Sequence, residues 1–312
     1  MKTMKPKAIF FGILVSTIFV FISCAQQDDF PVLKGPYLGQ QPPGMTPQIF
    51  APGVISTEER YELNAVFSQK GDEFYYEIST TTQEEKKQGI YFYIIMVSKM
   101  RNGVWIKPEI APFSGKYSTM DMNFSPDWTR LYFCSDRPNP WDSSSKTHIW
   151  YVDRLDNGWS EPKILGPPIF SPECEQGQPT FAKDGTMYFR QNPHGSFDLY
   201  YSGYENGKYS EPIILGEAIN TPYDEGKPFI APDESYLLFI RYGMPASIDG
   251  GRGLYISFKR EDGSWTPAKN TNIYGSLPKF TPDGKYFFFS RGGDVYWVDA
   301  KIIDELKPKE LK

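Results

Sequence analysis

The chain has 312 residues and a formal net charge of −5 at pH 7, and aromatic residues make up 16% of it. That length suffices for a large core, and the abundance of Tyr and Phe is typical of paired β-strands. The 27 glycines and 27 prolines are spaced as turns, so they favour many short strands over disorder. The acidic balance disfavours nucleic acid or an anionic membrane surface as the main partner.

The N-terminus is typical of a lipoprotein signal peptide, which we predict to span residues 1–23. Three lysines among the first seven residues precede the apolar run 8–22, and the tetrapeptide FISC that ends at Cys24 resembles a lipobox. A signal anchor with an incidental cysteine is the alternative, but Ser23 and Cys24 stand at the end of the apolar run. Cleavage would leave Cys24 as an acylated first residue, and two or more acyl chains give stable anchoring. We therefore expect an outer-membrane lipoprotein of the cell envelope, on the periplasmic or the surface-exposed side.

The stretch from Met122 to Pro162 contains the unit that the rest of the chain repeats. It reads MNFSPDWTRLYFCSDRP, then a polar insert, then HIWYVDRLDNGWSEP. A first strand ends before the Ser-Pro-Asp turn, a second spans 130–135, a third spans 148–154, and a fourth begins after Asn157-Gly158. The proline presets φ in the first turn, and the Asn-Gly pair supplies the positive φ values of a two-residue hairpin. The pattern predicts one small antiparallel sheet of four strands.

The same unit occurs five times along the chain. Its turn positions are 57, 57, 49 and 50 residues apart and hold Lys70, Asp127, Asp184, Asp233 and Asp283. The residues three positions earlier are apolar in every copy, namely Phe67, Phe124, Phe181, Ile230 and Phe280. Five copies of a four-stranded unit predict five blades.

The pattern FSPDWTRLYFCSDRP followed by IWYVD resembles the WD40-like (PD40) propeller repeat of the TolB type. That repeat is found in the periplasmic propeller protein of the Tol system and in many bacterial lipoproteins. The resemblance covers about residues 47–299 and departs locally, since Lys70 replaces a turn aspartate and Trp128 and Glu234 replace the usual glycine. It implies an all-β fold with a single β-propeller. It implies little about activity, because this fold hosts binding scaffolds and several unrelated enzymes.

Two incomplete ends of the repeat predict how the ring closes. The peptide Pro47–Phe50 resembles the fourth strands of the other repeats, whereas the last repeat has three strands and stops at Asp299. A propeller whose last blade takes its outer strand from the N-terminus leaves no open edge. We therefore predict five four-stranded blades over 47–299, closed by an N-terminal strand. Residues 24–46 should form a flexible tether, and 300–312 a solvated C-terminal tail.

Carboxylates near the starts of the inner strands are candidates for a ligand site or for glycoside hydrolysis. Five-bladed propellers include glycosidases, and this reaction requires two carboxylates at a controlled separation, one of them protonated. The candidates are Asp121, Glu175 and Glu225, with Glu62 at the corresponding place in the first repeat. The strictly equivalent inner-strand positions hold Asn64, Asp121, Gln178, Lys227 and Leu277. One acid in five does not make a catalytic set, so we predict no catalytic residue and favour capping hydrogen bonds at the blade junctions.

Four arginines follow the second strands at corresponding positions, namely Arg137, Arg190, Arg241 and Arg291. Guanidinium groups placed in this way could line one rim and hold a carboxylate or sulfate by paired hydrogen bonds. The alternative is that each arginine pairs with a local acid such as Asp136 or Asp294. These arginines are our first candidates for ligand binding.

Cysteine and histidine usage argues against metal chemistry. Cys134 and Cys174 either form a disulfide between neighbouring blades or remain as two half-buried thiols. The chain has only two histidines and no CxxC motif, which disfavours a zinc site, and we expect no metal and no cofactor. Neither GxSxG nor HExxH occurs, so nucleophilic hydrolysis has no support.

Two functions from different classes remain. The first is a monomeric, non-enzymatic propeller on a lipid anchor, which binds an envelope protein or glycan at its central funnel face. The second is a carbohydrate-active hydrolase or lyase with funnel carboxylates. Three convergent acids in the funnel would favour the hydrolase, and an arginine and aromatic rim without them would favour the binding protein.

Replacing Cys24 with Ala should abolish lipidation, because the thiol at this position is the predicted acyl acceptor. Metabolic labelling with a fatty-acid analogue measures this directly, and Cys134→Ala is the control that should keep the label. Equal labelling of wild type and Cys24→Ala would contradict the predicted lipobox.

Overall fold

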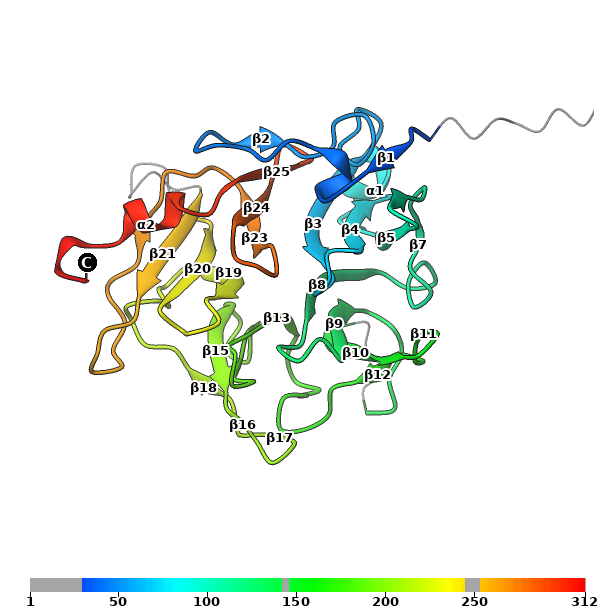
Figure 1. Ribbon diagram of the computed structural model, residues 1–312. Helices are drawn as coiled ribbons and strands as arrows, with labels where there is room; N and C mark the ends of the chain where they lie inside the picture. The colour runs from blue at the N-terminus through cyan, green and yellow to red at the C-terminus, as the bar shows by residue number, and fades with distance from the viewer. Residues whose placement is uncertain (1–29, 142–145, 245–252, 312) are drawn as a thin grey trace, which may run out of the picture. The chain divides into compact units, whose positions relative to one another are not determined.

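The computed structural model describes residues 30–141, 146–244 and 253–311, so the predicted signal peptide and Cys24 lie outside the described residues. From Val32 onward the chain forms one unit, in which five antiparallel sheets surround a common axis (Figure 1). The strands nearest the axis are the first strands of the five repeats. The predicted five-bladed β-propeller is therefore confirmed.

Within each blade the strands follow one another outward from the axis. The first blade contains β3 (Tyr61–Phe67), β4 (Glu73–Ser79), β5 (Tyr93–Arg101) and β7 (Glu109–Ile110). The second contains β8 (Thr119–Phe124), β9 (Arg130–Ser135), β10 (His148–Leu155) and β12 (Lys163–Ile164). The third contains β13 (Gln176–Phe181), β14 (Met187–Gln191), β15 (Asp198–Ser202) and β18 (Ile213–Ile214).

The last two blades have the same plan. The fourth contains β19 (Asp224–Ile230), β20 (Tyr236–Tyr242), β21 (Leu254–Phe258) and β22 (Lys269–Asn270). The fifth contains β23 (Ser276–Phe280), β24 (Tyr286–Arg291), β25 (Asp294–Asp299) and β2 (Gln48–Ile49). Short strands extend the outer edges, namely β1 (Leu33–Lys34), β6 (Val104–Trp105), β11 (Gly158–Trp159), β16 (Tyr204–Glu205) and β17 (Lys208–Tyr209).

In the part of the chain that the structure describes, helices are few and short. They are η1 (Tyr37–Gly39), α1 (Gln83–Lys87), α2 (Ile302–Leu306) and η2 (Lys309–Leu311). Across the three described ranges, no helix is long and apolar enough to cross a membrane.

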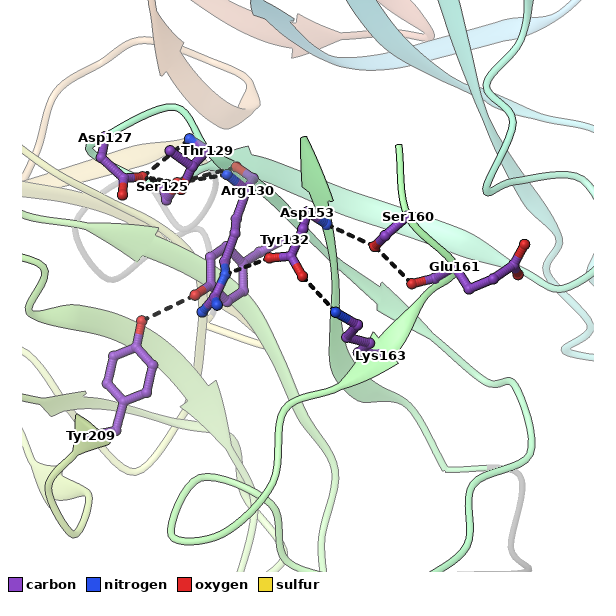
Figure 2. Close-up of polar contacts among 10 residues, drawn as sticks. All are labelled: Ser125, Asp127, Thr129, Arg130, Tyr132, Asp153, Ser160, Glu161, Lys163 and Tyr209. Atoms are coloured by element: carbon purple, nitrogen blue, oxygen red, sulfur yellow. Dashed lines mark hydrogen bonds and ion pairs between the residues drawn. The ribbon is translucent and has the colours of Figure 1, made fainter. Parts of the chain in front are cut away.

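The Ser-Pro-Asp turns form by the chemistry that their sequence indicates. In the second blade, Asp127 Oδ1 accepts hydrogen bonds from the Thr129 amide and from the hydroxyls of Ser125 and Thr129 (Figure 2). The aspartates of the next three turns accept from the amide two residues on, and they are Asp184, Asp233 and Asp283. The aspartate thus fixes the connection between the first and second strands in four blades.

Polar contacts also tie the outer strands of a blade together. Asp153 of β10 accepts from Arg130 Nε and from Lys163 Nζ, both at 2.7 Å, so one carboxylate links three strands (Figure 2). The hydroxyl of Tyr132 lies 3.5 Å from that of Tyr209 in the third blade's hairpin. Both contacts join strands that are already paired or packed, so they add to the order of the blade edge.

The N-terminal strand closes the ring as predicted. Gln48 pairs with Trp297 and Ile49 with Tyr296, so β2 is the fourth strand of the fifth blade. The Phe50 amide donates to Val295 O at 2.8 Å. The Phe50 ring is fully buried against first-blade and fifth-blade aromatic rings, namely Phe67, Phe74, Phe288 and Trp297. Hydrogen bonds and aromatic packing therefore join the last blade to the first.

The segments 24–46 and 300–312, predicted as a flexible tether and a solvated tail, both contain residues that pack on the ring. Part of the predicted tether is ordered onto the ring, since Leu33 pairs with Trp105, whose Nε1 donates to Gly35 O at 2.7 Å. Leu38 is 1% exposed in the core that the first and fifth blades share. The predicted solvated tail contains α2, which buries Ile303 against the fourth and fifth blades. In both segments, apolar residues that stand alone in a polar stretch of sequence pack against blades and cover their edges.

Replacing Phe50 with Ala should lower the free energy of unfolding by about 3–5 kcal/mol, the usual cost of truncating a buried phenylalanine. Chemical denaturation of the mature chain measures this loss. Ile49→Ala is the matched control, because Ile49 is the preceding residue and is 37% exposed, so its change should stay within about 1 kcal/mol. Equal stability of the Phe50 variant and wild type would contradict the role of this strand.

Candidate binding site

Each inner strand has a β-bulge at the same place, and the bulged residues meet near the axis. The strand register shifts there in all five blades. The residues concerned have φ between 28° and 61°, which is unusual for residues with side chains, and they are Asn64, Asp121, Gln178, Lys227 and Leu277. These are the five positions that the repeats identify as equivalent. The bulges turn their side chains toward one another across the ring.

The bulged residues build a polar plug in the middle of the ring. Lys227 Nζ lies 2.6 Å from Asp121 Oδ1, and the Lys227 amide donates to Gln178 Oε1 at 2.6 Å. Burial alone would raise the pKa of Asp121, but the adjacent Lys227 holds the pKa of that carboxyl below its ordinary value. The space left among these side chains is only about 10 Å³. No substrate fits into the plug.

A second carboxylate, Glu77 of β4, lies beside the plug. It is 1% exposed, and its Oε1 accepts from Asn64 Nδ2 at 2.8 Å and from the Met122 amide at 3.1 Å. Burial, and after it the charge of Asp121, raises the pKa of Glu77 to about 7. Two carboxyl groups with pKa values moved apart are typical of an acid and base pair. Here both are enclosed, so the pair has no access to a substrate.

The other predicted carboxylates are engaged in structural contacts. Glu225 is fully buried and accepts from the Thr221 amide and hydroxyl and from Arg241 Nε, the last at 3.1 Å. Burial raises the pKa of Glu225 to about 7. Glu62 has the same arrangement with Thr57 and Arg60. These contacts are the capping hydrogen bonds that the sequence favours.

Glu175 makes a weaker version of the same contact. Its Oε1 accepts from the Thr147 amide at 3.5 Å, and its own amide donates to Asn192 Oδ1. Of the three predicted carboxylates, the contacts bring Asp121 to Lys227 and Glu225 to Arg241. They bring no two of these carboxylates together.

Three of the four predicted arginines bind backbone carbonyls. Each donates to an oxygen in the connection that enters its own blade, and the acceptors of Arg137, Arg241 and Arg291 are Phe113 O, Ile219 O and Tyr274 O, at 2.8–3.0 Å. Burial lowers the pKa of Arg137. The sequence could not indicate these partners, because a carbonyl acceptor has no signature in the side-chain pattern. Arg241 also pairs with the local acid Glu225, as the alternative predicts, whereas among the described residues no side-chain ion pair joins Arg137 to Asp136 or Arg291 to Asp294.

The four arginines do not all border the same hollow. Arg241 and Arg291 border a hollow of about 560 Å³ between the fourth and fifth blades, together with the rings of Tyr242 and Tyr274. Arg190 instead places its guanidinium 4.0 Å from the Phe197 ring centre, and its Nε is buried without a hydrogen-bond partner.

A funnel opens on the opposite face, where the inner strands end at the Ser-Pro-Asp turns and their counterparts. It has a volume of about 430 Å³, and all five blades line it. The inner ring of its wall is Val66, Asn123, Thr180, Phe229 and Lys279. The outer ring is Phe67, Phe124, Phe181, Ile230 and Phe280, and Trp128 and Tyr236 widen it. The outer ring is the set of residues that aligns the repeats, but nothing in the repeat pattern assigns these residues to a hollow.

The charge in the funnel has one sign. Among its described lining residues none is Asp or Glu, and its two charged groups are Lys183 and Lys279. Lys279 is 6% exposed and makes no hydrogen bond or ion pair with any described residue. Burial lowers the pKa of Lys279 to about 8, although Asp121 and Glu77 oppose this. The funnel therefore combines an aromatic wall with a lysine at its floor that makes no hydrogen bond or ion pair with any described residue.

Cys134 and Cys174 are both buried and unpaired, which decides between the two alternatives that the sequence left open. Cys134 Sγ accepts from the Gln178 amide at 2.9 Å, and burial raises the pKa of its thiol. The described residues contain no group of three His, Cys, Asp or Glu side chains that could hold a metal ion.

The fold and the site define a five-bladed β-propeller with an aromatic axial funnel. Solved structures similar to it include TolB from Acinetobacter baumannii, at 15% identity over 78% of this chain and 55% of that one, with a TM-score of 0.48. A putative TolB from Agrobacterium tumefaciens has 14% identity over 75% of this chain and 71% of that one, with a TM-score of 0.47. A glycoside hydrolase has 10% identity over 86% of this chain and 92% of that one, with a TM-score of 0.50.

The likeness to these proteins concerns the fold alone, and the chain spans about half the length of the Acinetobacter TolB. No family model matches the chain, and no curated protein matches it. The function must therefore be argued from the site.

Replacing Glu77 with Gln should remove one source of pH-dependent stability. The folded state holds a proton on Glu77 up to about pH 7, whereas the unfolded chain releases it near 4.5. Wild-type stability from this group is therefore fully present below about 4.5 and lost as pH rises to 7, by an amount on the order of a few kcal/mol. Gln keeps the acceptor for Asn64 and Met122.

Chemical denaturation between pH 4.5 and 7.5 measures the difference between Glu77→Gln and wild type. Glu205→Gln is the control, since Glu205 is exposed and its change should leave the pH profile as in wild type. An identical pH profile for Glu77→Gln and wild type would show that Glu77 is ionised throughout this range.

Proposed function

We propose that this protein is a monomeric, non-enzymatic propeller that binds an apolar segment of a protein partner in its axial funnel. One observation carries the proposal: the hollow to which all five blades contribute is aromatic and lacks carboxylates among its described residues. A volume of about 430 Å³ lies in the range of ligand pockets and accommodates a few side chains. Aromatic, concave and partly desolvated sites are where protein interfaces concentrate their binding energy.

A protein partner fits the funnel better than a glycan does. Sugar hydroxyls need several fixed polar partners, whereas the described funnel lining is mainly apolar and aromatic. Its hydroxyls at Ser125 and Thr281 already donate to Asp127 and Asp283. Asn123 is the single amide side chain of this wall, and its Nδ2 already donates to Pro179 O at 3.4 Å. Polar specificity in the funnel therefore rests mainly on its lysines.

The hydrolase alternative is less well supported. Glycoside hydrolysis needs an acid and a second carboxylate on either side of a bound sugar. Asp121 and Glu77 are enclosed in or beside the plug, with about 10 Å³ of free space, and Glu225 is fully buried. These acids stabilise the ring, and the funnel that a ligand can enter contains none of them.

The cellular setting is part of the proposal. We place the propeller at the envelope on a lipid anchor at Cys24, which rests on the signal peptide and lipobox in the sequence. Two or more acyl chains on one residue would hold the protein stably at the membrane. The funnel would then be presented to other envelope proteins.

Site-specific photo-cross-linking in cells tests this function. A photoreactive phenylalanine analogue at Trp128, in the funnel, should give a discrete adduct with a protein partner. The same analogue at Trp141, which is 49% exposed outside the funnel, is the matched control and should give none. The variant Asn123→Trp, which fills the funnel, should weaken binding of that partner at least tenfold.

The opposite results are equally specific. Adducts that form only at Trp141 would move the binding site away from the funnel. Cleavage of envelope glycans by the purified mature chain, lost in Asp121→Asn or Glu225→Gln, would replace this proposal by the hydrolase.

A further inference from the structure

We propose that the funnel binds the C-terminal end of its polypeptide partner and that the terminal carboxylate pairs with the ammonium group of Lys279. This inference rests on the proposed function and names the chemistry that the site recognises. It follows from the position of Lys279, from the charge of the funnel and from the shape of its floor.

Lys279 is a buried cation that forms no ion pair or hydrogen bond with any residue that the structure describes. It belongs to β23, lines both the funnel and the plug, and is 6% exposed. Burying an unpaired charge is costly, and such groups in proteins are normally paired. Its acidic neighbours are already occupied, since Asp121 binds Lys227 at 2.6 Å and Glu77 accepts from Asn64 and Met122. The funnel side of Lys279 is therefore open to an anion supplied by a ligand.

The lining favours a ligand that is apolar and anionic at the same time. None of the described funnel residues is Asp or Glu, and exposed Lys183 adds a second positive charge nearer solvent. The acids behind Lys279 belong to the plug, where Lys227 pairs with Asp121. The rings of Phe229 and Phe280 stack at 4.6 Å beside Lys279. A carboxylate at the floor with hydrophobic side chains along the wall complements both features.

The floor selects a chain end over a chain interior. Below Lys279 the plug leaves only about 10 Å³, so a polypeptide cannot pass along the axis. A segment that entered the funnel in mid-chain would have to bring two backbone strands through the same mouth. A C-terminus brings one strand, and it carries its carboxylate at the tip.

The pH dependence of this contact has a defined sign. The charged and titratable groups that face Lys279 are Asp121 of β8, Glu77 of β4, Lys227 of β19 and Cys134 of β9. Burial lowers the pKa of Lys279 to about 8, so the amine is protonated below that pH and neutral well above it. Affinity for a carboxylate should fall by up to tenfold per pH unit as the pH rises above about 8.

Matched peptides test the inference on the full mature chain. The probes are N-acetyl-Leu-Phe with a free C-terminal carboxylate, the same peptide as its C-terminal amide, and the amide of N-acetyl-Leu-Asp-Phe. Binding is measured by calorimetry and by Trp128 fluorescence at pH 7.5. The free acid should bind at least tenfold more tightly than either amide, and Lys279→Met should reduce the acid to the level of its amide. Lys183→Met is the control and should keep most of the difference.

Several results would overturn the inference. Equal binding of acid and amide would contradict it, and so would failure of both to bind, or an acid preference that survives in Lys279→Met. Preference for the Asp-containing amide would assign recognition to an acidic side chain in place of the terminal carboxylate.

If thermal denaturation shows that Lys279→Met folds poorly, the wild-type protein provides the test. A ratio of acid to amide affinity that stays constant from pH 7.5 to 9.5 would then contradict the pairing. Cross-links from Trp128 that persist in these cases would leave the proposed function standing, whereas their absence would count against that function itself.

Discussion

The pairing of β2 with β25 is the interaction on which the rest of the ring depends. Phe50 packs between aromatic rings of the first and fifth blades, and the backbone of its strand completes the last sheet. These two neighbouring blades supply Val66 and Lys279 to adjacent parts of the funnel wall. Without this strand the outer edge of β25 would be unpaired and the packing of Phe50 between the two blades would be lost, so the contact that sets the spacing of the first and fifth blades would be weakened.

The axis of the ring is divided into a polar layer and an apolar layer. The Asp121–Lys227 pair lies in the polar plug, where replacing one partner would leave a buried charge unpaired. The aromatic funnel lies next to it and takes its floor from the plug. This division explains how a protein with several carboxylates near its axis has an accessible hollow that contains none among the described residues. The plug buries the acids, and the funnel next to it provides the surface that a ligand can reach.

The sequence predicted the parts of the fold that depend on local signals. Turn residues such as Asp127 and the spacing of the repeats identified the blades, and the likeness of Pro47–Phe50 to other outer strands identified the closing strand. The equivalence of the five bulged positions was also visible. Their pairing was not, because Asp121 and Lys227 are 106 residues apart and meet only after the ring has closed.

The functional assignments were harder for two physical reasons. The arginines use backbone carbonyls such as Phe113 O as acceptors, and a carbonyl is present at every residue, so no pattern singles it out. Val66, Asn123 and Phe229 look like ordinary strand residues, and only the convergence of five blades makes them a wall. Lys279 carried the best available signal, a lone lysine at a position that is uncharged in the other four repeats.

The ordered segment between Gly35 and β2 has a mechanical consequence. Any tension on the chain upstream of Leu33 would first load the two-residue pairing of β1 with β6 and the bond from Trp105 to Gly35 O. Buried Leu38 would have to leave the first blade before force reached Gln48. These contacts would therefore break before the closing strand β2 bears any force. A protein held from its N-terminus could be pulled without opening its ring.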